Sequence, residues 1–176
     1  MYQVGSIIFY GGSGVCRVDG IRQQEFSGEL RDYYVLPPIH SAASTVYLPT
    51  DSAPLLARVR AVMTKEAVEQ LILQLPETAI DWIENENLRK QRFQKILRGG
   101  DQKEIAGLVR TVYLHNKALQ ASGRKLRQSD ERFFKEAQRI FMDEAAYVLG
   151  IEMNEVVGHI AKMLGEDESD LLKAHY

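Results

Sequence analysis

The spacing of the apolar residues changes once along this chain, and that change limits the folds that the chain can adopt. Up to about Ala53, apolar residues occur in short runs rich in β-branched and aromatic side chains, separated by Gly, Pro and Ser. Such runs are typical of short strands joined by turns. Beyond this point they recur every three or four positions, which is the period of an amphipathic helix. We therefore expect an α+β protein in which a β module precedes a helical bundle.

The first part of the chain predicts a small, strongly bent sheet or barrel. Pro37-Pro38 ends one of its runs, because proline cannot donate a hydrogen bond to a neighbouring strand. Residues 11–14, Gly-Gly-Ser-Gly, are interpreted as a hairpin turn, because they lack the Lys-Ser/Thr of a phosphate-binding loop. A module of about fifty residues buries only a small core, so we expect it to be stabilised by packing against the neighbouring domain. The expected strands are residues 6–10, 15–18, 31–36 and 45–48.

The second part of the chain predicts about five helices. Thr64 is a candidate N-cap for the first of them, and Gly99-Gly100 is a stop signal after the second. Asp101-Gln102-Lys103-Glu104 resembles a capping box that opens the third. We expect two domains, residues 1–55 and residues 56–176. The expected helices are residues 64–75, 82–97, 101–121, 129–149 and 154–164.

Positive charge is concentrated in the middle of the chain. The whole chain has 22 basic and 24 acidic residues, whereas residues 82–132 contain 12 basic and 6 acidic ones. An acidic tail ends the chain and is expected to be solvated. Such a basic segment favours an anionic partner, although charge runs are more often simply solvated helix faces. The candidate phosphate-contacting residues are Arg89, Lys90, Arg92, Lys95, Arg98 and Arg110.

The other reactive side chains do not suggest an active site. Cys16 is the single cysteine, which excludes an internal disulfide and a multi-cysteine metal site, so we expect a small core residue. The histidines have no metal-ligand spacing, and the chain has neither a signal peptide nor a run of about 18 apolar residues. We expect a non-enzymatic cytoplasmic protein with no cofactor, metal, membrane or small-molecule substrate. The histidines are His40, His115, His159 and His175.

Several short motifs follow one another in a fixed order along the chain. Val4-Gly5, Gly28-Glu29 and residues 46–49, Val-Tyr-Leu-Pro, lie in the first part. Gly100-Asp101 followed by Val109-Arg110 lies in the second. Each motif is weak alone, but their shared order over about residues 1–150 resembles the CarD/CdnL family. The members of that family are bacterial factors that hold RNA polymerase on promoter DNA.

The resemblance implies a Tudor-like or SH3-like N-terminal β-barrel that docks on the RNA polymerase β subunit. An all-α domain would follow, contact promoter DNA near the −10 element and stabilise the open complex. Tyr47 and a position near Gln24 replace arginines that contact polymerase in the family, so positive charge is lost here. The structural alternative buries Val46 and Leu48 and leaves Tyr47 as an ordinary outward residue. The candidate docking residues are Gln24, Val46, Tyr47, Leu48 and Pro49.

Trp82 is the candidate for the tryptophan that family members wedge into the minor groove of DNA. Counted back from Gly100-Asp101, it lies about one helical turn too early, and Glu86 occupies the wedge position unless four residues are inserted. The alternative is a partly buried tryptophan that packs the start of the helix.

Two other functions remain open at this stage. The helical domain could recruit a further protein, which would make the chain an adaptor on RNA polymerase without direct DNA contact. A module that binds RNA or the ribosome is the third possibility, because small barrels often serve there.

Overall fold

The computed structural model describes residues 2–40 and 44–165 and divides the chain into two compact units between Val62 and Met63. The first unit therefore extends beyond residue 55, where the sequence placed the domain boundary. The reason is β6 (Val59–Ala61), which pairs antiparallel with β1 (Ile7–Tyr10) and so belongs to the β module. His175 and the acidic tail from residue 166 lie outside the described residues.

Two antiparallel three-stranded sheets make up the described part of the first unit, in the orders β2-β1-β6 and β3-β4-β5. Hydrogen bonds from Arg17 N to the Pro37 carbonyl (3.1 Å) and from Ile39 N to the Val15 carbonyl (2.9 Å) join them. Within the described residues, no strand pairing closes the two sheets into a barrel. The remaining elements are β2 (Gly14–Arg17), β3 (Gly20–Phe26), β4 (Glu29–Leu36), β5 (Val46–Pro49) and α1 (Ala53–Leu56).

The sequence does not predict β3, because most of its side chains are polar and exposed. The strand nevertheless pairs with β4 along its whole length, from Gly20 opposite Val35 to Phe26 opposite Glu29. Ser27 and Gly28 connect the two strands and both have positive φ angles (56° and 82°), as tight hairpin turns require. Backbone pairing therefore holds this hairpin where core burial cannot.

A compact apolar cluster fills the inside of the first unit. Ile8 and Tyr10 from β1 meet Cys16 from β2 and Leu36 from β4, and all four are buried. Leu48 contributes from β5. The prediction that Cys16 is a small core residue is confirmed, because it is fully buried in this cluster.

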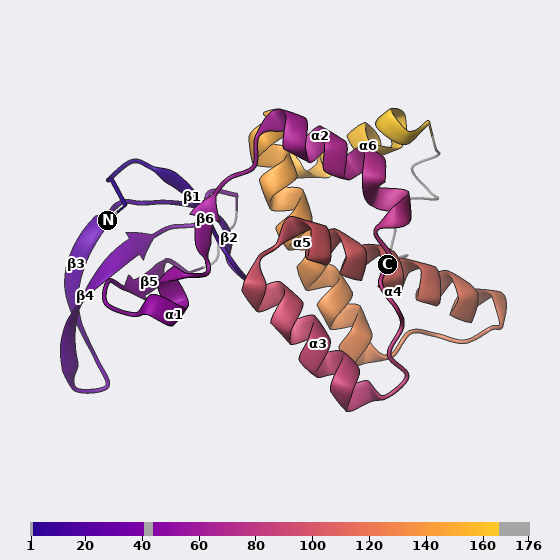
Figure 1. Cartoon of the computed structure of the whole chain (residues 1–176), viewed down its shortest axis with the longest axis horizontal. Coiled ribbons are helices and arrows are strands. Elements are labelled where there is room, and N and C mark those ends of the chain that lie inside the picture. The colour runs from indigo at the N-terminus through magenta and orange to yellow at the C-terminus, as the bar shows by residue number, and fades with distance from the viewer. Residues whose placement is uncertain (1, 41–43, 166–176) are drawn as a thin grey trace. The chain divides into compact units, whose positions relative to one another are not determined.

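The second unit is helical, and its described helices follow the predicted stripes closely. Thr64 Oγ1 accepts from Ala67 N (3.2 Å) at the start of α2, and Asp101 Oδ1 accepts from Glu104 N (2.9 Å) at the start of α4. In Figure 1, α2 lies beside α6, and α4 and α5 are the longest helices. Short 3-10 turns lie at Leu75–Glu77 and Met153–Glu155. The helices are α2 (Lys65–Gln74), α3 (Glu86–Gly99), α4 (Gln102–Ala121), α5 (Gln128–Leu149) and α6 (Val156–Leu164).

One helix start differs from the prediction. The sequence placed the second helix at residues 82–97, but α3 begins at Glu86 because the Asn85 side chain caps it, accepting from Leu88 N at 3.1 Å. Trp82 consequently lies in the connecting segment before α3. In the part of the chain that the structure describes, no helix has the length and apolarity to cross a membrane.

Candidate functional site

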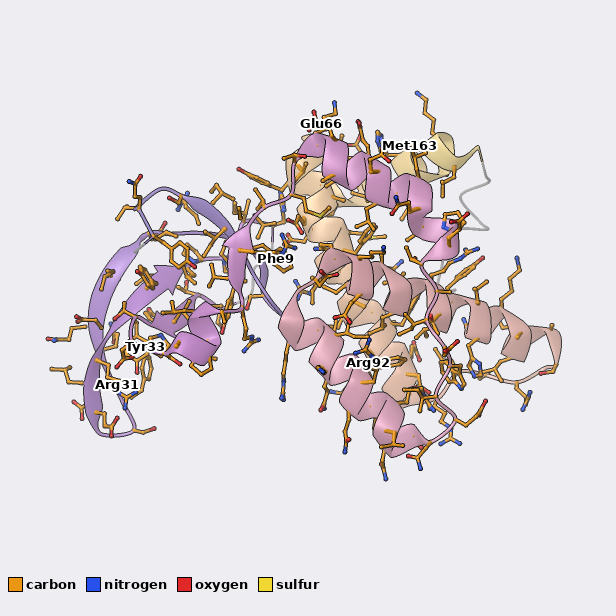
Figure 2. All side chains as sticks on the ribbon, in the orientation of Figure 1. Phe9, Arg31, Tyr33, Glu66, Arg92 and Met163 are labelled. Carbon is orange, nitrogen blue, oxygen red and sulfur yellow. The ribbon has the colours of Figure 1, made fainter. Side chains whose placement is uncertain are left out.

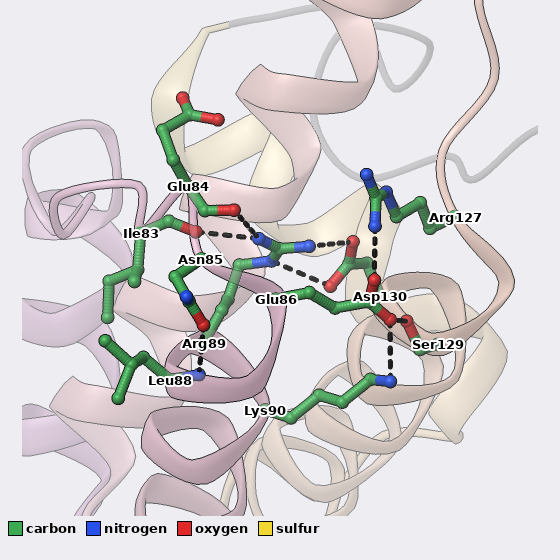
Figure 3. Close-up of polar contacts among 10 residues, drawn as sticks. All are labelled: Ile83, Glu84, Asn85, Glu86, Leu88, Arg89, Lys90, Arg127, Ser129 and Asp130. Atoms are coloured by element: carbon green, nitrogen blue, oxygen red, sulfur yellow. Dashed lines mark hydrogen bonds and ion pairs between the residues drawn. The ribbon is translucent and has the colours of Figure 1, made fainter.

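Arg89, the first residue of the predicted basic row, is buried. Its side chain is 3% exposed and forms a bidentate ion pair with Asp130 (Figure 3). Arg89 Nε donates to Oδ1 at 2.9 Å, and Nη2 donates to Oδ2 at 2.8 Å. Its Nη1 donates to the main-chain carbonyls of Ile83 (2.7 Å) and Glu84 (3.1 Å). Arg89 shares a helix face with the buried Phe93, which explains why it points inward. The expectation that Arg89 contacts phosphate therefore needs correction, because its donors are used inside the protein.

A second set of contacts lies outside this pair and is built around Glu86. Its carboxylate accepts from Lys90 Nζ (2.6 Å) and forms an ion pair with Arg127 (Figure 3). Ser129 Oγ lies 3.4 Å from Glu86 Oε1, the same oxygen that accepts from Lys90. The hydrogen bond from Lys90 lowers the pKa of Glu86, with Arg127 acting in the same direction. Lys90 is thus partly neutralised by its own helix and presents less charge outward than the sequence suggests.

The basic row continues outward one turn after Arg89. Arg92 is half-buried and pairs with Glu104 (3.0 Å), whereas Lys95 and Arg98 are exposed. These three residues follow at i,i+3 spacing, so they form a shallow spiral on the surface of α3. A cavity of about 310 Å³ between α3 and α5 lies at the end of the row, with Arg98 and the exposed Arg132 among its lining residues.

The sequence analysis misses one exposed arginine, Arg132, and includes another arginine, Arg110, that is half-buried. Arg132 was not a candidate, although it lies within the basic segment and is exposed. Arg110, which was a candidate, is half-buried on α4, with its guanidinium over the Tyr113 ring at 5.7 Å. Its Nε is buried without a hydrogen-bond partner, so little of this side chain faces outward.

Trp82 packs within the second unit. Its indole stacks on the His115 ring, with centroids 3.5 Å apart and planes 12° apart, and the Arg89 guanidinium lies 4.4 Å from the ring centre. The segment before it is fixed on α4, because Ile80 exchanges two hydrogen bonds with the Thr111 hydroxyl (2.7 and 3.0 Å). Insertion into DNA would require the indole to leave this stack. The structure therefore gives Trp82 a packing role.

Gly107 on α4 allows this segment to come so close. A Cβ atom at this position would lie 2.6 Å from the Thr78 carbonyl oxygen and 3.2 Å from Ile80 Cγ2. The absence of a side chain at Gly107 is thus what lets the chain before α3 rest on α4.

The surroundings of His115 disfavour its protonated form, so its pKa lies below the ordinary value. Burial lowers its pKa, and the nearby charge of Arg89 acts in the same direction, against the opposing charges of Glu84 and Asp130. A neutral imidazole is the form that stacks on the indole without carrying an uncompensated charge into a half-buried site. In the described part of the chain, no group of three His, Cys, Asp or Glu side chains could hold a metal ion.

Three of the five candidate docking residues lie on one face of the β3-β4-β5 sheet. Tyr33 of β4 is paired with Pro49 and, two residues along, Val35 is paired with Tyr47. Gln24 is opposite Arg31, which is on the same face of β4. Figure 2 shows Arg31 and Tyr33 on β4.

Val46 and Leu48 point to the opposite face, into the core of the first unit. Tyr47 is 37% exposed and packs beside Phe26, with ring centroids 5.8 Å apart. Phe26 also meets the Tyr33 ring edge-on at 5.0 Å. We call Phe26, Tyr33 and Tyr47 the aromatic face. Sequence reasoning missed Phe26 because β3 was not expected, so nothing placed it beside Tyr47.

β5 is the last strand of its sheet. Among the described residues it pairs with β4 alone, so its other edge is free of strand pairing. A sheet edge of this kind can accept an extended segment of a partner through backbone hydrogen bonds.

The fold and these surfaces define a two-module binding protein, with a β unit that offers a strand edge and a helical unit that carries exposed cations. The family described as CarD-like/TRCF RID domain matches residues 2–62, and the one described as CarD, C-terminal domain matches residues 70–161. The chain belongs to the CarD/CdnL family, whose members are transcription regulators that interact with RNA polymerase. Comparison with curated proteins gave no match to this chain.

The buried ion pair predicts a large effect of Asp130→Asn on stability. This change keeps the shape of the side chain but leaves the Arg89 guanidinium buried without a counter-charge. We expect the free energy of unfolding to fall by about 3–5 kcal/mol, measured by urea denaturation. The matched control is Glu104→Gln, which breaks the partly exposed pair with Arg92 and should cost at most about 1 kcal/mol. Similar small losses in both variants would show that the pair is not structurally important.

The stacked His115 predicts a pH dependence of stability. Its pKa is lowered in the folded state, so as the pH falls the unfolded chain takes up the proton first, near its ordinary pKa of about 6.5. Neutral His115 therefore makes its full contribution to the free energy of unfolding above that pH. This contribution is lost as the pH falls through the pKa that His115 has in the folded protein. His115→Phe keeps a stacking ring but cannot titrate. Between about pH 7 and pH 5 the wild-type protein should therefore lose stability relative to the variant; a constant difference would contradict this.

Proposed function

We propose that this protein holds RNA polymerase on promoter DNA. Its β unit acts as a Tudor-like module that docks on the polymerase β subunit. Its helical unit contacts promoter DNA near the −10 element and stabilises the open complex. Both family matches support the first contact. The observation that carries the second is the exposed end of the basic row on α3, where Lys95 and Arg98 are exposed and Arg98 lines a cavity together with Arg132.

The DNA contact is made mainly to phosphates. Lys95 and Arg98 project from one helix, and Arg98 and Arg132 line the same cavity between α3 and α5. Contacts of this kind fix where a protein sits on DNA without reading the bases. Each phosphate neutralised releases counterions and adds about −0.9 to the slope of log affinity against log salt. With few exposed cations at this surface, the isolated protein binds DNA weakly and with strong salt sensitivity.

The polymerase contact combines the free edge of β5 with the aromatic face. Backbone pairing along β5 needs no particular side chain, so the loss of the family's arginines at Tyr47 and near Gln24 does not remove it. Tyr47 and Phe26 supply apolar contact area beside that edge. Aromatic side chains contribute much of the binding energy in many interfaces.

Docking makes the weak DNA contact effective. Once the β unit is bound to polymerase, the helical unit is held near the promoter at a high effective concentration. If it binds the melted promoter better than the closed one, it shifts the equilibrium toward the open complex by that difference in affinity.

The basic row predicts that Lys95→Glu combined with Arg98→Glu abolishes the promoter effect. We expect the double variant to bind polymerase normally but to lose most of the gain in open-complex lifetime, measured by the decay of promoter complexes after competitor DNA is added. Lys103→Glu is the control, because Lys103 is exposed in the first turn of α4 and outside the row. A double variant that behaves as wild type would favour the adaptor without direct DNA contact.

The aromatic face predicts that Tyr47→Glu weakens docking. Placing a carboxylate beside the Phe26 ring removes apolar contact and should reduce the affinity for RNA polymerase core about tenfold or more, measured by pull-down or interferometry. Leu30→Glu is the matched control, because Leu30 is 62% exposed on the other face of β4. Equal losses in the two variants would contradict the assignment of the docking face.

A further inference from the structure

A second cavity of about 390 Å³ lies in the helical unit, apart from the α3–α5 cavity. Its lining residues come from the segment before α3, from α3 itself, from the second half of α4, from the connection between α4 and α5, and from the start of α5. Trp82 and His115 form one wall through their stacked rings. The volume is within the range of about 300–1,000 Å³ that is typical of sites for small ligands.

The cavity carries an excess of positive charge in a protein whose net charge is −2. Arg89 and Asp130 both line it but neutralise each other. Arg127 is engaged with Glu86, which lies outside the lining. The remaining charged residues of the lining are two cations of the connection, Arg124 and Lys125, and one carboxylate, that of Glu84.

Arg124 and Lys125 are both available to a ligand. Both are exposed, and Arg124 Nε is engaged only with the Ser122 hydroxyl at 3.0 Å, which a stronger acceptor could replace. Lys125, within the described residues, has neither a hydrogen bond nor an ion pair. Two adjacent cations of this kind suit a phosphate group, which offers several strong acceptor oxygens at one point.

Two leucines supply an apolar part of the lining. Leu119 from α4 and Leu126 from the connection are both half-buried at the cavity. An inorganic anion would leave this wall without a partner, whereas a ligand that joins a phosphate to a flat, partly apolar group would use both parts. A nucleotide has this composition.

We propose that this cavity binds a nucleotide, with its phosphate on Arg124 and Lys125 and its base or sugar against Leu119 and Leu126. The nucleotide is either free in solution or an unpaired residue of the melted promoter strand, and both present the same chemistry. The two cations proposed to hold the phosphate lie outside the exposed part of the basic row on α3, which ends at Lys95 and Arg98. Failure of the nucleotide site would leave the proposed function intact, and the reverse also holds.

Trp82 gives a direct readout, because it is the protein's single tryptophan and lines the cavity. The full-length protein is titrated with ATP, with a single-stranded thymidine oligonucleotide, with a duplex of the same length, and with inorganic phosphate. Tryptophan emission and heat of binding are followed in parallel. We expect saturable binding of ATP or of the single strand, and much weaker binding of inorganic phosphate. Binding of ATP identifies a free nucleotide as the ligand, and binding of the single strand alone identifies melted DNA.

The combined change Arg124→Glu with Lys125→Glu should weaken this binding about tenfold or more, since it reverses both phosphate contacts. Lys103→Glu is again the control, and circular dichroism checks that each variant is folded. Three results would overturn the proposal: no saturable binding by either method, equal affinity in the double variant, or an equal loss in Lys103→Glu. Preference for the duplex over ATP and the single strand would also overturn it, since that is the signature of a charged surface.

Discussion

The buried ion pair between Arg89 and Asp130 is the interaction on which the helical unit depends. It joins α3 to α5, and the remaining donors of Arg89 hold the main chain at Ile83 and Glu84. A buried guanidinium is costly unless its hydrogen bonds are satisfied, and here carboxylate and carbonyl oxygens satisfy it. The same guanidinium lies over Trp82, so one side chain contacts the segment before α3, the indole and the cavity that Trp82 lines.

This arrangement explains why the number of basic residues overstates the cationic surface. Arg89 is buried in an ion pair with Asp130. Lys90 and Arg127 both form ion pairs with Glu86, and Arg92 is paired with Glu104. Exposed cations are found at the end of α3 and in the connection after α4. Neither group is large enough for tight binding to nucleic acid alone, because affinity rises with the number of phosphates neutralised. A protein of this kind needs a tether, and the β unit is suited to provide one.

The parts of the fold that sequence predicts well are those with local signals. Helical stripes and caps such as Thr64 and Asp101 act within a few residues, so the five helices could be placed from the chain itself. β3 could not, because its polar residues are ordered by pairing with β4 and have no alternating pattern of their own. Arg89 could not be separated from its exposed neighbours for a related reason. Its partner, Asp130, lies 41 residues away, and nothing in the spacing of charges reveals such a contact.

The two proposed partner surfaces are expected to differ in their sensitivity to salt, because different side chains build them. Contacts between Lys95 or Arg98 and phosphates are driven by counterion release and weaken steeply as salt rises. Contacts made by the β5 edge and by Phe26 and Tyr47 rely on backbone hydrogen bonds and apolar burial, which salt screens little. In the proposed function, docking is therefore the more salt-resistant of the two contacts. The proposal implies that, as ionic strength rises, the protein is released from DNA while it stays on polymerase, so that the promoter contact can form again.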